Sequence, residues 1–120
     1  MAVKGKHRRL GFWGEMRARR YLKSNGYKIV RRNYKSPFGE VDIIAEKEDV
    51  TAFIEVKTRT SDSFGAPNEA VDSRRRDRYK NAARYYFARR QIDCTVRFDV
   101  IEVKKEGGKS AVNHIENAFY

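Results

Sequence analysis

Two neighbouring runs that alternate apolar and charged residues constrain the fold of this chain more than any other feature. Residues 40–45 read EVDIIA and residues 50–57 read VTAFIEVK, with the polar segment 46–49 between them. Runs of this length joined by a short polar segment predict two antiparallel strands of a hairpin. The hairpin must therefore hold acidic and basic side chains within a sheet that also buries a core.

The hairpin register predicts which of these side chains meet. Side chains alternate between the two faces of a strand. A tight turn at residues 48–49 places Asp42 opposite Glu55, with Cβ atoms roughly 5 Å apart, and Lys57 on the same face. One face is expected to hold Glu40, Asp42, Ile44, Phe53, Glu55 and Lys57, and the other Val41, Ile43, Ile54 and Val56.

Two carboxylates opposed at that distance repel each other, so Lys57, a shared proton or a divalent cation must compensate. Hard oxygen ligands suit Mg²⁺ or Mn²⁺. Beside such an ion, Lys57 would orient a water molecule or stabilise charge that develops on a phosphate. The alternative is that Glu40–Lys57 and Glu55–Lys57 are ordinary cross-strand ion pairs on a solvated face of the sheet.

Charge is unevenly distributed along the 120 residues, whose net charge is +11. Residues 1–35 carry a net charge of +11, residues 36–73 carry −6 and residues 74–90 carry +7. If the fold packs the two basic segments around the acidic middle, it forms an anionic pocket rimmed by cations, which favours a nucleic-acid partner. The alternative is that most of these side chains are solvated surface charges.

Composition excludes several other classes of protein. A chain of this length forms one domain. No run approaches the roughly 18 apolar residues of a membrane span, so no membrane partner is expected. The basic N-terminus lacks the apolar stretch of a signal peptide. Cys94 is the only cysteine, so no internal disulfide forms and a cytoplasmic localisation is expected.

The remaining pattern predicts an α/β fold with a single mixed β-sheet flanked by helices, in the order α-β-β-β-α-β. The first three strands are expected to form an antiparallel meander, and the second helix to cross to the fourth strand. Residues 1–10 are expected to be a flexible basic segment, and residues 11–120 one domain whose last ten residues add a short strand or tail. Helices are expected at residues 11–24 and 67–90, strands at 27–33, 40–45, 50–57 and 94–104, and a turn at 36–39.

Single residues outside the hairpin are mostly expected to be structural. His7 and His114 are expected at the surface, because neither has a partner at ligand spacing. Tyr85 is expected at the rim of the second helix. The inner face of that helix is expected to hold Val71, Tyr79, Ala82, Ala83, Tyr86 and Phe87.

Glu15 is an acid on the apolar stripe of the first expected helix, which it shares with Ala18 and Leu22. A lone carboxylate on such a stripe is costly unless it has a cationic partner or takes part in a site. Two interpretations stay open: Glu15 belongs to the same site as the hairpin carboxylates, or it lies at the edge of the stripe and pairs with Arg19.

These motifs together resemble a known family. The Gly-Glu-x-Asp-Ile-Ile strand at residues 39–44, the Phe-Ile-Glu-Val-Lys-Thr-Arg strand at residues 53–59 and the upstream Gly14-Glu15 resemble the PD-(D/E)XK nuclease fold. More closely, they are similar to the small YraN-like proteins, which are related to archaeal Holliday-junction resolvases. The resemblance covers residues 11–104 and implies a restriction-endonuclease-like core.

The resemblance also implies roles for individual residues. Asp42 and Glu55 would bind the catalytic Mg²⁺ or Mn²⁺ ion together with the backbone carbonyl of Val56. Lys57 would be the catalytic lysine, and Glu15 the helix acid found in resolvase-like members. Where the second helix of the family has a lysine, this chain has Arg75, which we assign to phosphate binding because arginine is a forked donor.

The resulting expectation is a metal-dependent endonuclease that acts on DNA, including branched or structured DNA. The alternative is a protein of the same fold that binds nucleic acid without cleaving it. Because resolvases work in pairs, the resemblance also makes a homodimer plausible. The basic side chains expected to contact the nucleic acid are Arg17, Arg20, Arg59, Arg74, Arg75 and Arg78.

Overall fold

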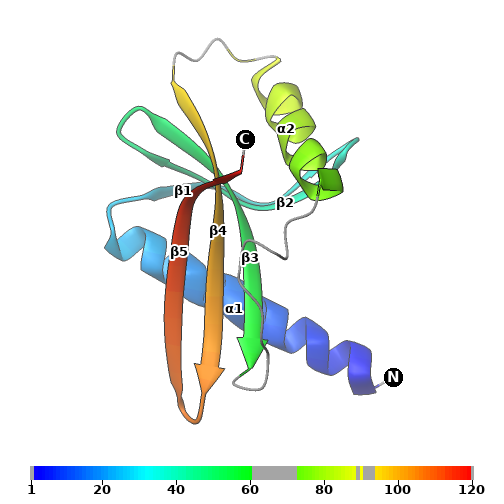
Figure 1. Ribbon diagram of the computed structural model, residues 1–120, viewed down its shortest axis with the longest axis vertical. Helices are drawn as coiled ribbons and strands as arrows, with labels where there is room; N and C mark the ends of the chain where they lie inside the picture. The colour runs from blue at the N-terminus through cyan, green and yellow to red at the C-terminus, as the bar shows by residue number, and fades with distance from the viewer. Residues whose placement is uncertain (1, 61–72, 89, 91–93, 120) are drawn as a thin grey trace.

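The computed structural model describes residues 2–60, 73–88, 90 and 94–119. They form an α/β structure in which a five-stranded sheet lies between two helices (Figure 1). The helices are α1 (Ala2–Ser24) and α2 (Ser73–Phe87), and the strands are β1 (Lys28–Ser36), β2 (Gly39–Lys47), β3 (Val50–Thr60), β4 (Thr95–Glu106) and β5 (Lys109–Phe119).

The strands lie in the order β1-β2-β3-β4-β5 across one mixed sheet. β1, β2 and β3 are antiparallel neighbours, β3 and β4 are parallel, and β4 and β5 form an antiparallel hairpin. The parallel pair needs a crossover connection, and α2 lies in that connection. The predicted mixed sheet and antiparallel meander are confirmed, and β5 extends the order to α-β-β-β-α-β-β.

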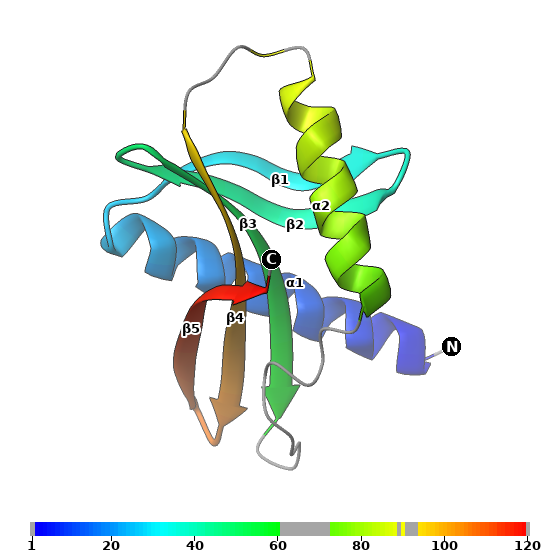
Figure 2. The ribbon, with the colours of Figure 1, turned by 45° about the horizontal axis from the view of Figure 1, so that its top comes forward.

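The two helices cover opposite faces of the sheet, as Figure 2 shows with α2 in front and α1 behind. Alternation along each strand divides its apolar residues between two cores. Ile44, Phe53 and Val100 pack under α2, while Ile43, Ile54 and Ile101 pack under α1. The predicted inner face of α2 is confirmed for Tyr79, Ala82, Ala83 and Tyr86, which are buried, and for Phe87, which packs against the same core.

Three expected features differ from the structure. α1 begins at Ala2 and not at residue 11, because residues 2–10 contain no proline that would stop the helical hydrogen-bond ladder. β1 runs to Ser36 and not to residue 33. The second helix, expected at residues 67–90, ends at Phe87 and not at residue 90. Val71 and the rest of 61–72 lie outside the described residues, so the helix is confirmed from Ser73 to Phe87.

The prediction that Val41 shares a face with Ile43 is wrong. Val41 packs with Ile44 under α2, whereas Ile43 packs under α1. The register between β2 and β3 runs only from Lys47↔Val50 to Ile43↔Ile54, and beyond it Val41 pairs with Tyr34 of β1 alone. A two-stranded ribbon twists more strongly than a wide sheet, so the simple alternation does not continue past the last shared pair.

The prediction of a surface His114 is also wrong. The His114 side chain is 4% exposed and its Nε2 lies 2.7 Å from Asp99 Oδ2, while its Nδ1 lies 3.1 Å from the Tyr21 hydroxyl. Arg97 Nε donates to Asp99 Oδ1 at 2.9 Å, and the backbone N–H of Asn117 donates to the same oxygen. This network connects β5 and α1 to the centre of β4, and the sequence around His114 does not reveal it.

Replacing Asp99 by asparagine is expected to lower the free energy of unfolding at neutral pH by about 3–5 kcal/mol, since Arg97 then loses its buried partner. Burial alone would raise the pKa of Asp99, but hydrogen bonds from His114, Arg97 and Asn117 hold it below the ordinary 3.8. A carboxyl with a lowered folded-state pKa stabilises above its unfolded pKa, and that stabilisation disappears as the pH falls through the folded value. Urea unfolding from neutral to strongly acidic pH should therefore show the two proteins converging in acid.

The matched control is Glu116→Gln, because Glu116 also pairs with Arg97, at 3.5 Å, but its side chain is 59% exposed. An exposed pair contributes about 0–1 kcal/mol, so this variant should stay close to the original protein throughout. If the free energy of unfolding of Asp99→Asn stays below that of the original protein by the same amount down to the lowest pH, the expected pH dependence is contradicted.

Candidate functional site

The site forms where β2 and β3 separate. The last registered pair of their ladder is Ile43↔Ile54. Beyond it, Asp42 Oδ2 accepts a hydrogen bond from the backbone N–H of Val56 at 2.8 Å, so a carboxylate takes the place of the partner strand. The Tyr79 hydroxyl enters from α2, accepts from the Asp42 N–H at 3.4 Å and donates to the Ile54 carbonyl at 3.5 Å. The opened ladder is thus completed by side chains.

The main chain of Val56 also contributes to this opening. The N–H and C=O of one strand residue point to the same side of the strand. Because the Val56 N–H faces Asp42, its carbonyl oxygen is directed to the same side, away from β4. A carboxylate oxygen and a main-chain oxygen are therefore turned toward one space.

Glu55 is buried at the same end of the hairpin, with 5% of the residue exposed. Its Oε1 lies 2.8 Å from Arg75 Nη1 of α2 and 3.4 Å from Lys57 Nζ of β3. Arg75 therefore lies inside the site and forms an ion pair with Glu55. The phosphate-binding role expected for Arg75 stays a prediction. The predicted meeting of Glu55 and Lys57 on one face is confirmed.

Glu15 reaches this region because α1 approaches β3 closely. A Cβ on Gly14 would lie 1.8 Å from the Thr58 Oγ1, so a larger residue would push the helix away. In the amide orientation that satisfies its hydrogen bonds, Asn33 of β1 donates to Glu15 Oε1 at 2.9 Å and to Glu40 Oε1 at 3.0 Å. Glu15 thus lies beside the hairpin acids, and it is also electrostatically coupled to Arg19. The position of Glu15 favours the first interpretation, and no ion pair joins Glu15 to Arg19 among the described side chains; a role of Glu15 in the chemistry stays a prediction.

Closely spaced carboxylates dominate the electrostatics of the pocket. The pKa of Asp42 is raised to about 7: burial has the largest effect, the neighbouring Glu15, Glu55 and Glu40 add to it, and the hydrogen bond from the Val56 N–H opposes it. The pKa of Glu15 is raised by burial and by Glu40, against the effect of Arg19. Such a cluster takes up a proton or a cation at neutral pH.

The candidate ligand atoms are all oxygens, which suits a hard divalent cation, but they are few. Carboxylate and carbonyl oxygens are the ligands of Mg²⁺ and Mn²⁺. Within the described residues no group of three or more His, Cys, Asp or Glu side chains lies close enough to hold a metal ion. The candidate ligands are therefore two carboxylates, Asp42 and Glu55, and one main-chain oxygen, that of Val56, with the remaining positions left to water or substrate.

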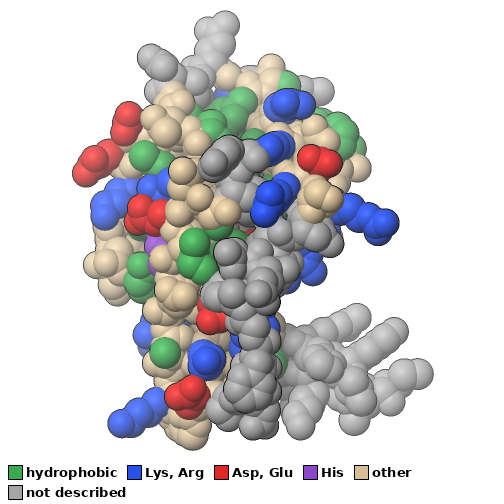
Figure 3. Space-filling view, in the orientation of Figure 1, with side chains coloured by type: hydrophobic (Ala, Val, Ile, Leu, Met, Phe, Trp, Pro, Cys, Tyr) green, Lys and Arg blue, Asp and Glu red, His purple; other side chains and the backbone are tan. Residues whose placement is uncertain are grey.

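The other basic residues expected to contact nucleic acid lie at several places. Arg78 covers Gly39, where a Cβ would lie 2.1 Å from its Cδ. Arg59 pairs with Glu102 at 2.8 Å. Arg17 donates to Ser110 Oγ at 3.0 Å, at the far hairpin. Arg20 and Arg74 are exposed. Figure 3 shows Lys and Arg side chains gathered over α2 on the face turned to the viewer, and Arg74, Arg75 and Arg78 belong to that helix.

Three residues that build the site were not identified from the sequence as part of it. The sequence pattern predicts Tyr79 only as a core residue, although its i+4 spacing from Arg75 places both on one side of α2. Gly14 was noted only as the neighbour of Glu15. Asn33 carries no periodic signal, and it has a positive φ of 49° within β1.

A mixed sheet between two helices, with two acids and a lysine at a split hairpin, defines an α/β protein with a PD-(D/E)XK nuclease-like core. The model of the uncharacterised protein family UPF0102 matches residues 14–103. The chain belongs to this family, which is PD-(D/E)XK nuclease-like, and the resemblance to YraN-like proteins is thereby confirmed. The family description names no activity.

Similar proteins of the family are found in distant bacteria. A UPF0102 protein of Syntrophomonas wolfei is 46% identical over 114 residues, which cover 94% of this chain and 99% of the relative. A UPF0102 protein of Clostridium perfringens is 40% identical over 120 residues, covering 98% of both chains. One from Bacteroides thetaiotaomicron is 44% identical over 114 residues, covering 95% of this chain and 94% of the relative.

Replacing Asp42 by asparagine is expected to stabilise the protein when divalent cations are absent. Because the folded-state pKa of Asp42 is raised to about 7 from 3.8, the charged carboxylate opposes folding above pH 7. The variant should therefore be more stable by a few kcal/mol above pH 7, and this gain should disappear as the pH falls toward 3.8. Thermal unfolding in a chelating buffer across this pH range measures it.

Asp49→Asn, in the exposed turn between β2 and β3, removes the same charge outside the pocket and is the control. It should give no comparable gain above pH 7. An Asp42→Asn protein that is less stable than the original at alkaline pH would show that the carboxylate supports the fold, contrary to this interpretation.

Proposed function

We propose that the protein is a metal-dependent endonuclease that hydrolyses phosphodiester bonds in DNA, including branched or structured DNA. The observation that carries the proposal is the opening of the β2–β3 ladder, which turns Asp42 and the main chain of Val56 toward one space beside the buried Glu55 and Lys57. Family membership supports it, because the family is nuclease-like in fold.

The residues of the pocket divide the work as follows. Asp42, Glu55 and the Val56 carbonyl would hold Mg²⁺ or Mn²⁺, which supplies charge neutralisation for the attacked phosphate when bound. Lys57, 19% exposed at its side chain, reaches both Glu55 and the solvent, so it can orient the attacking water and stabilise charge on the phosphate oxygens. Glu15, which is held by the Asn33 amide, provides a further carboxylate at the rim that accepts a hydrogen bond from this water.

Arg75 has two roles in this proposal. Its guanidinium binds Glu55 at 2.8 Å, and the side chain is 35% exposed, so a phosphate oxygen can approach it from the solvent. Release of Glu55 by Arg75 would let the carboxylate turn to the cation while the guanidinium binds the DNA backbone. Arg74 and Arg78 on the same helix extend the basic surface.

The second candidate is a nucleic-acid-binding protein that keeps this fold without cleaving its ligand. The observation in its favour is that Lys57 and Arg75 already place two positive charges on Glu55. In such a protein the side chains of Lys57 and Arg75 permanently occupy the position that the metal ion would take. It would bind DNA in a salt-dependent manner and would not bind Mn²⁺ in calorimetry.

The endonuclease proposal predicts that Glu55→Gln abolishes cleavage of a plasmid or a four-way junction in Mg²⁺ or Mn²⁺. The expected loss is at least about 100-fold, since the charge stabilisation that a bound ion supplies amounts to several kcal/mol. Calorimetric titration with Mn²⁺ should show binding by the original protein and by Lys57→Met, but not by Glu55→Gln. Lys57→Met should bind the ion and cleave no faster than Glu55→Gln.

Glu46→Gln is the matched control, because it makes the same substitution at the other end of the β2–β3 hairpin. It should cleave and bind Mn²⁺ like the original protein. Cleavage by Glu55→Gln at the original rate would overturn the proposal, and absent Mn²⁺ binding together with intact DNA binding would favour the second candidate.

A further inference from the structure

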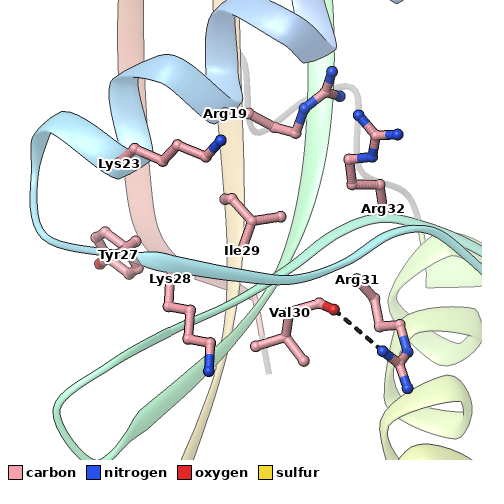
Figure 4. A pocket seen from close by; sticks show the side chains of 8 residues that line it. All are labelled: Arg19, Lys23, Tyr27, Lys28, Ile29, Val30, Arg31 and Arg32. Carbon is pink, nitrogen blue, oxygen red and sulfur yellow. Dashed lines mark hydrogen bonds between the residues drawn. The ribbon is translucent and has the colours of Figure 1, made fainter.

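A basic groove lies between the second half of α1 and the edge strand β1. It is an open hollow of about 680 Å³, seen from close by in Figure 4. Its lining includes no acidic residue and five cations: Arg19, Lys23, Lys28, Arg31 and Arg32. Neither the sequence motifs nor the proposed catalytic residues account for this concentration of charge.

The cations are arranged around the strand. In Figure 4, Arg19 and Lys23 reach from α1 and Arg32 from β1 into the space above Ile29, while Lys28 and Arg31 point to the other side of β1. The register of β1 against β2 shifts between Ile29 and Arg31, which is a bulge. The bulge and the edge position expose positive side chains on both sides of one strand.

Ion pairs in the described part of the chain do not neutralise these charges. Across the ranges that the structure describes, none of the five cations forms an ion pair with an acidic side chain. Arg19 and Arg32 are close enough to influence each other: burial lowers the pKa of Arg19 and Arg32 lowers it further, against the effect of Glu15. Like charges held together in a hollow are relieved by an anion.

The groove is joined to the acidic pocket by its own residues. Arg19 lies one helical turn after Glu15, and the two are electrostatically coupled. Arg32 immediately precedes Asn33, whose amide donates to Glu15 and Glu40. A chain of phosphates along the groove would therefore continue onto the acids at the split hairpin.

We infer that this groove, built around Arg19, Lys23 and Arg32, binds the sugar–phosphate backbone of the nucleic acid and leads it to the pocket of Asp42 and Glu55. The direction toward the pocket rests on the proposed function, whereas the binding itself does not. The concave shape and the buried Tyr27 offer nothing to insert into a membrane surface. Symmetric pairing of two copies through this groove would oppose like charges.

The test is the affinity for a fluorescently labelled DNA duplex, measured by anisotropy in a chelating buffer over a series of salt concentrations. Arg19→Gln combined with Arg32→Gln is expected to weaken binding at least about tenfold and to reduce the slope of log affinity against log salt by about 2. The double variant should also unfold at a temperature no lower than the original protein, because it removes a repulsion. The control, Arg84→Gln combined with Lys109→Gln, removes two exposed charges from α2 and the β4–β5 turn.

Equal affinities and slopes for the double variant and the control would overturn the inference. The inference would also be overturned if the original protein bound anionic phospholipid vesicles and not the duplex, and if the double variant lost that binding. The measurement excludes metal, so it is independent of cleavage. If the groove is wrong and the proposed function right, the double variant still cleaves DNA in Mg²⁺ at the original rate. If the proposed function is wrong and the groove is correct, the double variant still binds the duplex more weakly than the original protein in the chelating buffer.

Discussion

The end of the β2–β3 ladder at Ile43 and Ile54 is the constraint on which the candidate site depends. A regular ladder would have continued to residues 42 and 55 and closed the space between the strands with main-chain hydrogen bonds. Instead the two strands part, and Asp42 accepts from the Val56 N–H that the partner strand leaves unsatisfied. Only in this gap can a carboxylate and a main-chain oxygen of different strands face one point.

Both helices stabilise that gap through β3, which is the central strand of the sheet. α2 supplies the Tyr79 hydroxyl, which bridges the Asp42 N–H and the Ile54 carbonyl, and Arg75, which binds Glu55. From the opposite face, Gly14 lets α1 approach Thr58 and places Glu15 at the rim. The site is therefore positioned by two helices on a strand that has neighbours on both sides, which favours a fixed geometry.

Part of this could be predicted from the alternation of residues 40–57, from which the face shared by Glu55 and Lys57 and the pairing of Ile44 with Phe53 follow. The mixed sheet follows from the order of the expected helices and strands along the chain. Val41 could not be placed in this way, since its direction depends on where the ladder ends. His114 could not be placed either, because its burial depends on a partner, Asp99, that lies on a different strand. Such pairings between distant segments leave no periodic signal in the sequence.

Two neighbouring regions of this small protein hold like charges together, and within the described residues most of these charges form no ion pair. At the split hairpin burial raises the pKa of Asp42 and of Glu15, and neighbouring carboxylates, including that of Glu40, raise both further. In the groove Arg19 and Arg32 repel each other. The attraction between Glu15 and Arg19, which belong to the same helix, offsets only part of the repulsion within each set. A ligand that is both a polyanion and a carrier of divalent cations relieves both at once, because its phosphates match the groove and its counterions match the acids. The separation of these two opposite charges is therefore better explained by one extended ligand than by the stability of the chain itself.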